Sequence, residues 1–207
     1  MQKLHYNGLN EDALREVEAS QACKHFWIHE SVPRHWTYYF CIQYDQEHCL
    51  VFYADTELVI GYEECVFLCC EKQFIDKKKA YCTPPQRSYP QDANLPAVWS
   101  YLGSETAPLR MELIHDTVVF QIIEANESIA EEWEISANVG LAIHTDEKTW
   151  ILMTADGAPR MIYLKDISEM EPITETWRYH YDLPEQVSAD DPYRIDLVTA
   201  KREFLPL

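Results

Sequence analysis

Residues 40–62, FCIQYDQEHCLVFYADTELVIGY, are built from short apolar runs separated by polar breaks. The runs are rich in Val, Ile, Phe and Tyr, whereas the breaks at 45–48 and 54–57 contain acids and turn formers. This pattern is typical of an antiparallel meander, in which short strands follow one another through tight connections. It predicts three strands, at 38–44, 49–54 and 58–62.

The same rhythm returns 101 residues later, counted from Asp55 to Asp156, in LAIHTDEKTWILMTADGAPRMIY at 141–163. Asp45 corresponds to Asp146 in this alignment. Two interpretations stay open, an ancient duplication and a coincidence of two meanders that both use acidic turns. We favour coincidence, because any two such meanders share part of this pattern.

The remaining chain predicts a mainly β (α+β) fold of antiparallel meanders with one N-terminal helix, and two similar β-rich halves are an open alternative. Asn10 is a helix N-cap, with Glu11 and Asp12 in the first turn, and the helix is expected over 11–22. Asp116-Thr117 is expected to be a hairpin turn, and Asn126 to cap a short helix through 128–132. Further strands are expected at 65–70, 110–115, 118–123, 140–144, 149–154, 160–164, 176–181 and 194–198, and the last residues, EFLPL, are expected to dock on the domain.

Five prolines between 83 and 108 divide the chain into a helix-plus-meander half at 1–82, a connector at 83–108 and an acidic β-rich half at 109–207. The two halves are compatible with one continuous domain, because 207 residues suit either one domain or two small ones.

Charge is the strongest compositional feature. The formal net charge is −18; residues 1–111 hold 15 acids and 10 Lys/Arg, and residues 112–207 hold 20 acids and 7 Lys/Arg. A net −13 in the second half disfavours direct binding to nucleic acid or to anionic membranes and attracts basic protein surfaces. The alternative interpretation, that the acids simply keep the protein soluble, is at least as well supported as the attraction of a basic partner.

Seven cysteines, an odd number, lie between positions 23 and 82, several of them inside apolar runs. This distribution predicts reduced, buried thiols rather than a disulfide framework. The sequence shows no apolar run long enough to span a bilayer and no signal-peptide core at its beginning. A cytoplasmic location is therefore expected.

Candidate metal ligands are few. His25 and His29 would share one face if their segment were helical, and His35 follows; the segment is equally compatible with a strand. Phe26 replaces the glutamate that the zinc-protease pattern requires, so two ordinary histidines are the simpler interpretation. Cys65, Cys69 and Cys70 lie in a strand-like run that would place them on both faces, which suits core packing better than one metal.

Catalytic motifs are not evident. Glycine-rich phosphate loops and the G-x-S-x-G elbow are missing from the sequence, and no cofactor is expected. Adjacent acids such as Glu131 and Glu132 would point to opposite faces of a strand, and so form no obvious catalytic dyad.

Aromatic residues exceed what a core of this size needs, with six Trp and thirteen Tyr. Tyr and Trp are enriched at binding hot spots, around which acids form an electrostatic rim. Our leading hypothesis is a non-enzymatic acidic protein that binds a basic protein partner, as an inhibitor or immunity-type neutraliser does; core packing of the same aromatics is the competing interpretation. The expected partner-binding residues are Trp177, Tyr179, Tyr181, Glu131, Glu132, Asp190 and Asp191.

The alternative function is an enzyme or a small-ligand or metal-binding protein with a His/Cys-lined pocket, which would use His25, His29 or His35 beside a cysteine. A third hypothesis is a scaffold that associates with itself. The sequence does not decide among these three.

Overall fold

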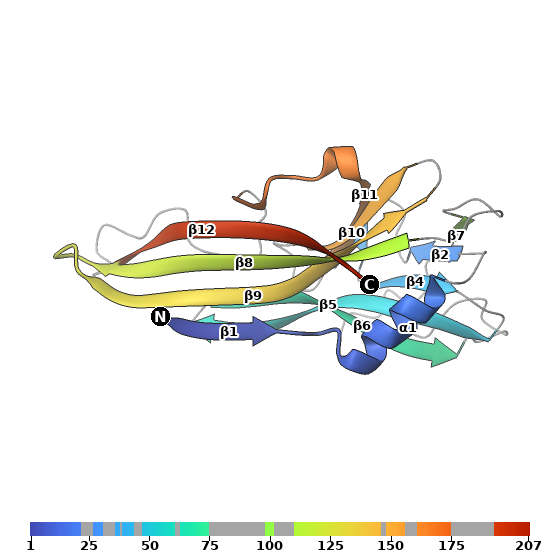
Figure 1. Cartoon of the computed structure of the whole chain (residues 1–207), viewed down its shortest axis with the longest axis horizontal. Coiled ribbons are helices and arrows are strands. Elements are labelled where there is room, and N and C mark those ends of the chain that lie inside the picture. Colours follow the sequence, from blue (N-terminus) through green and yellow to red (C-terminus); the bar gives the residue numbers. More distant parts are fainter. Residues whose placement is uncertain are drawn as a thin grey trace.

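The structure, a computed structural model, describes residues 1–21, 27–30, 36–37, 39–43, 47–60, 63–74, 98–101, 110–145, 148–155, 161–174 and 193–207. These residues form two β-sheets and one α-helix near the N-terminus (Figure 1). The predicted fold class, mainly β with antiparallel meanders and an N-terminal helix, is confirmed.

The larger sheet has seven strands in the order β12-β8-β9-β10-β11-β3, and β1 joins it by pairing with β9. All these pairs are antiparallel except β1 with β9, which is parallel. The strands of this sheet are β1 (Gln2–Tyr6), β3 (Trp36–Thr37), β8 (Arg110–Glu124), β9 (Ile129–His144), β10 (Thr149–Ala155), β11 (Met161–Asp166) and β12 (Tyr193–Pro206).

The smaller sheet is antiparallel throughout, with the order β6-β5-β4-β2-β7. Its strands are β2 (Trp27–Glu30), β4 (Tyr39–Gln43), β5 (His48–Ile60), β6 (Glu63–Phe74) and β7 (Val98–Tyr101). The helices are α1 (Glu11–Ser20) and the short 3-10 helix η1 (Ile167–Glu169).

The main hydrophobic core contains side chains of both sheets. Phe40, Phe52 and Leu68 of the smaller sheet belong to one buried cluster with Leu113 and Leu141 of the larger sheet. The first and second halves of the chain therefore share a core; the expected boundaries at 82 and 108 remain predictions. A second buried cluster contains Ile114, Val118, Phe120, Ile135, Ala137, Ile151, Met153 and Tyr163.

Helix α1 forms as predicted. The Asn10 side chain accepts a hydrogen bond from the Ala13 amide at 2.9 Å, which satisfies one of the unpaired amides of the first turn. Val17 is fully buried, so the apolar face of the helix closes one side of the main core. The helix ends at Ser20, two residues before the expected end at position 22.

The second break in the opening stretch is not a turn. Strand β5 continues through 54–57, where Asp55 pairs with Phe67 and Thr56 with Val66. The β4 pairing ends at Tyr53, so among the described residues this part of β5 pairs with β6 alone. Acids are tolerated there because Asp55 is only partly buried and Glu57 is exposed. The two copies of the repeat thus share one hairpin but differ after position 54.

Strand β8 is also continuous, and the predicted hairpin at Asp116-Thr117 is wrong. Asp116 remains inside the sheet because Arg202, 86 residues away in sequence, pairs with it. The chain reverses instead at 125–128, where a short helix was expected. The Asn126 side chain accepts a hydrogen bond from the Ser128 amide at 2.8 Å, an Asx-turn that uses the same chemistry as an N-cap.

Candidate partner-binding arm

The β8–β9 hairpin and the strands beside it form the left end of the molecule in Figure 1. We call residues 117–136 together with 193–201 the arm. Arg194 of β12 fixes the hairpin tip with two 2.7 Å hydrogen bonds to the Glu127 carboxylate. This pairing lowers the pKa of Glu127 below its ordinary value. Glu127 has a φ of 67°, a left-handed conformation that a tight reversal requires.

Trp133 lies in the middle of the arm. The strand registers place it beside Phe120, which in turn lies beside Leu197, so the three form a row across β9, β8 and β12. Phe120 is buried, whereas Trp133 is partly exposed and Leu197 is exposed. The Trp133 indole N–H donates a 2.8 Å hydrogen bond to the Glu131 carboxylate, two residues earlier on the same face. An aromatic ring is thus held next to a negative charge at the surface.

Three glutamates of the arm are paired with no cation among the described residues. The carboxylates of Glu124, Glu131 and Glu132 accept hydrogen bonds from the neutral groups of Ser128, Trp133 and Gln121. Other arm acids are paired with cations, as Glu134 is with Lys3 at 2.8 Å. The sequence of the hairpin, 117–136, contains five Glu and no Lys or Arg. Its negative field therefore persists after folding.

The structure separates the predicted neighbours Glu131 and Glu132. Glu131 contacts Trp133, whereas Glu132 contacts Gln121 across the β8–β9 pair, on the other face of the strand. The two adjacent side chains thus point to opposite faces of β9, as expected for a strand. The other expected partner-binding residues, namely Trp177, Tyr179, Tyr181, Asp190 and Asp191, lie outside the described residues.

Sequence reasoning missed Trp133 as a site residue. The signal was the run EEWE at 131–134, in which acids flank a tryptophan on both sides. A helix was expected at 128–132, which hid this signal. Glu131 and Trp133 share a face only because the segment is a strand, β9.

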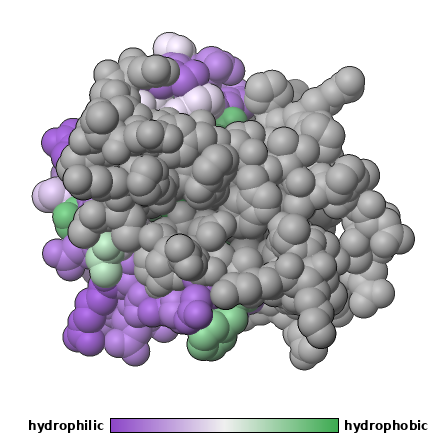
Figure 2. Space-filling model, turned by 90° about the vertical axis from the view of Figure 1, so that its right-hand side faces the viewer, coloured by the Kyte–Doolittle hydropathy of each residue, from purple (hydrophilic) through white to green (hydrophobic). Residues whose placement is uncertain are grey.

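The coloured surface at the end of the molecule opposite the arm is predominantly hydrophilic (Figure 2).

A buried ion pair lies at the base of the arm. Arg202 donates two hydrogen bonds of 2.7 Å to the Asp116 carboxylate, and the side chains are only 7% and 3% exposed. Burial raises the pKa of Asp116, although Arg202 acts in the opposite direction. Burial also raises the pKa of nearby Tyr163 to about 12. These groups are held too deep to meet a protein partner and serve the fold.

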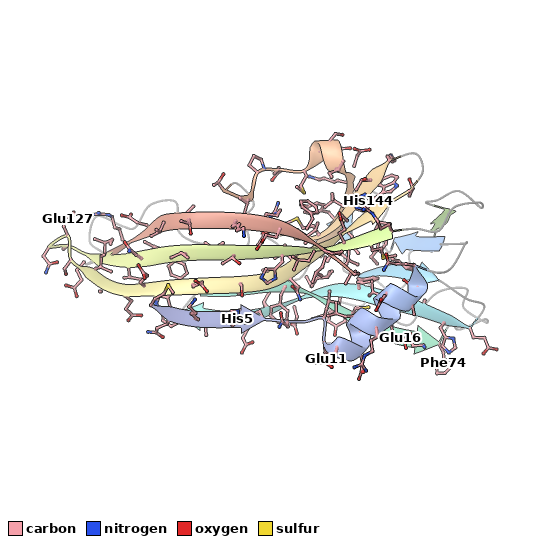
Figure 3. All side chains as sticks on the ribbon, in the orientation of Figure 1. His5, Glu11, Glu16, Phe74, Glu127 and His144 are labelled. Atoms are coloured by element: carbon pink, nitrogen blue, oxygen red, sulfur yellow. The ribbon has the colours of Figure 1, made fainter. Side chains whose placement is uncertain are left out.

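The described histidines are engaged across strand pairs. His144 contacts the Thr149 hydroxyl through Nδ1 at 2.9 Å and the Glu112 carboxylate through Nε2 at 2.8 Å (Figure 3). His115 contacts Asn138, and His5 contacts Ser136. Because His144 and Thr149 are direct cross-strand partners, strand pairing alone accounts for their contact.

The described residues contain no group of three His, Cys, Asp or Glu side chains that could hold a metal ion. His29 lies in strand β2, so the helical face that would join it to His25 does not exist there. His25 and His35 lie outside the described residues, as does the side chain of His29.

Four cysteines are buried, as expected: Cys49, Cys65, Cys69 and Cys70. Cys65 and Cys70 belong to different hydrophobic clusters, which agrees with their predicted positions on opposite faces. Burial raises the pKa of the Cys70 thiol well above its ordinary value, which makes it a poor nucleophile at neutral pH.

Comparisons of the chain with protein families, curated proteins and solved structures find no match. Helices of the described residues are all too short or too polar to cross a membrane.

Proposed function

We propose that this protein is a non-enzymatic binding protein that captures a basic protein partner through the arm, with Trp133 as its aromatic anchor. One observation carries the proposal: the indole N–H of the partly exposed Trp133 is hydrogen-bonded to the Glu131 carboxylate, in a hairpin where Glu124 and Glu132 pair with no cation among the described residues. Aromatic anchors with a charged rim are typical of binding hot spots.

The charge distribution supports this function. A net charge of −18 accelerates encounter with a positively charged surface, and the arm concentrates part of that charge on an extended hairpin. Leu197, which is 37% exposed and pairs with Phe120, adds apolar contact area at the far end of the row that begins at Trp133. Neutralising a toxin, as immunity proteins do, is the finer hypothesis, and it rests on composition alone. Trp177, Tyr179, Tyr181, Asp190 and Asp191 remain proposed partner-binding residues.

Affinity capture from a host lysate at low salt, with elution by rising salt, tests the proposal. The wild type is expected to retain one basic protein at equimolar amounts. The arm variant E124Q/E131Q/E132Q should lose it, while the matched helix variant E11Q/D12N/E18Q, which removes the same number of charges, should keep it. Equal loss in both variants would show that only net charge matters, and would overturn the assignment to the arm.

The alternative function, an enzyme or small-ligand binder, has one contact in its favour. Thr149, His144 and Glu112 form a hydroxyl–imidazole–carboxylate chain, an arrangement that nucleophilic catalysis uses. Native mass spectrometry of the purified protein discriminates the two functions: a bound metal or small molecule supports the alternative, and capture of a basic protein supports the arm.

A further inference from the structure

We propose that β12 forms an edge-to-edge, two-fold symmetric contact with β12 of a second copy of the chain. β12 is the outermost strand of the larger sheet: the described residues place β8 on one side of it and no strand on the other. An edge of 14 residues carries a row of backbone donors and acceptors that another strand can pair with.

The edge strand is long, and several of its large apolar side chains are exposed to solvent. Leu197, Val198, Phe204 and Leu205 are 37%, 47%, 37% and 38% exposed. Edge strands that avoid association are usually short or bear inward-pointing charges; β12 is 14 residues long, and its inward-pointing Arg202 is already paired with Asp116. Pro206 stands only at the end of the strand.

The charges on β12 are self-complementary. Arg194, Asp196, Lys201 and Glu203 occur in the order plus, minus, plus, minus along the strand. In an antiparallel pair whose two-fold axis passes between Val198 and Thr199, Arg194 lies opposite Glu203 of the second copy. In the same register Asp196 lies opposite Lys201, and symmetry repeats both contacts.

The bulge in β12 makes this register possible. Arg194 and Asp196 pair with Ile123 and Gln121 of β8, whereas Lys201 and Glu203 pair with Thr117 and His115. All four partners in β8 are odd-numbered residues of an unbulged stretch, so all four charged side chains lie on one face. Without the register shift between Leu197 and Thr199, the two halves of the pattern would lie on opposite faces.

Within one copy these charges already contact their neighbours on the strand, and Arg194 also holds Glu127 through two 2.7 Å hydrogen bonds, so Asp196, Lys201 and Glu203 are the charges most able to exchange partners. Arg194 and Asp196 are 3.2 Å apart, Lys201 and Glu203 are 2.7 Å apart, and all four side chains are at least 40% exposed. Exposed pairs of this kind contribute little to the stability of a monomer. On the opposite face Leu197 would meet Ala200, an apolar contact. The dimer joins the larger sheets of the two copies into one continuous sheet and leaves Trp133 of each copy accessible.

Sedimentation velocity over a range of concentrations tests the proposal on the full chain at about 0.15 M salt, where long-range repulsion between the acidic copies is screened. The wild type should show a concentration-dependent dimer. D196K places two lysines opposite each other at two symmetric sites, and should weaken the dimer at least about tenfold. The double variant D196K/K201D restores opposite charges and should recover wild-type association to within about threefold.

Glu18→Lys is the matched control, because it makes the same charge change at an exposed position of α1 rather than on this edge. It should leave the dimer unchanged, and unfolding midpoints should show that every variant folds. A wild type that stays monomeric at about 100 µM, or a double variant as weak as D196K, would overturn the proposal. A monomer whose β12 instead accepts a strand of a foreign protein would overturn it as well. The readout is the mass of this chain alone, so it is independent of the basic partner proposed above.

Discussion

Replacing Arg202 by Met should lower the free energy of unfolding more than replacing any exposed charged residue does. Arg202 donates two 2.7 Å hydrogen bonds to Asp116, and both side chains are almost fully buried. Removing the cation leaves a buried carboxylate without its charge partner, which costs about 3–5 kcal/mol of unfolding free energy. Urea unfolding followed by tryptophan fluorescence at pH 7 measures this loss, and Arg15→Met, in an exposed helix pair, should cost nothing measurable.

The double variant D116L/R202M separates charge desolvation from simple loss of packing. It removes the charge as well as its partner, so its stability should return to within about 1–2 kcal/mol of the wild type. Burial raises the pKa of Asp116, and this sets the sign of the pH effect. The contribution of Asp116 to the free energy of unfolding is most favourable at low pH, and it is lost as the pH rises and the buried carboxyl group ionises. The deficit of R202M should therefore shrink towards pH 4. If R202M costs less than about 1 kcal/mol, or the double variant costs as much as R202M, the reasoning is refuted.

Three further perturbations test other parts of the structure. The pKa of Tyr163 is about 12, so stability that is present below pH 10 should fall as pH rises towards 12, and Tyr163→Phe should remove this component, by roughly 2 kcal/mol, from alkaline unfolding curves. Gly140→Ala should destabilise by about 1–3 kcal/mol in urea unfolding, because an added Cβ would lie 2.4 Å from the Leu152 carbonyl oxygen; an unchanged midpoint would contradict the close approach. Asn10→Ala should cost about 1 kcal/mol through loss of the helix cap, and Asn10→Asp should retain most of that stability.

Local structure could be predicted from the sequence where the residues that determine it lie within a few positions of one another. Asn10 and the acids after it predicted α1 to within two residues of its end, because capping depends only on neighbouring groups. The alternating runs at 39–43 and 149–155 predicted strands for the same reason.

Features that depend on partners distant in the sequence could not be predicted. Asp116 resembles a turn residue until Arg202 is known to neutralise it, and nothing near Asp116 in the sequence indicates this. Strand β12 extends to Pro206 although its run at 200–203, AKRE, is polar, because alternate residues face outwards and Arg202 is paired. Strand β1 was missed as well: it has little apolar pattern, and its pairing with β9 spans more than 120 residues of sequence.

The candidate site was predicted in composition but only partly in position. Acidic residues and aromatics directed attention to Glu131 and Glu132, whose role in binding stays a prediction, and the neighbouring Trp133 was overlooked because the segment was expected to be helical. The repeat at 141–163 reflects one shared hairpin, since β5 passes straight through the position at which β10 ends.

The central claim is that the arm, rather than net charge in general, captures a basic protein. The most direct measurement is the association rate constant of the captured protein with E124Q/E131Q/E132Q, compared with that of E11Q/D12N/E18Q at the same low salt. Figure 3 shows Glu127 at the tip of the arm, well separated from Glu11 and Glu16 on α1. Capture by the arm predicts a rate at least about tenfold lower for the arm variant and within about twofold of wild type for the helix variant. Equal rates for the two variants would contradict it.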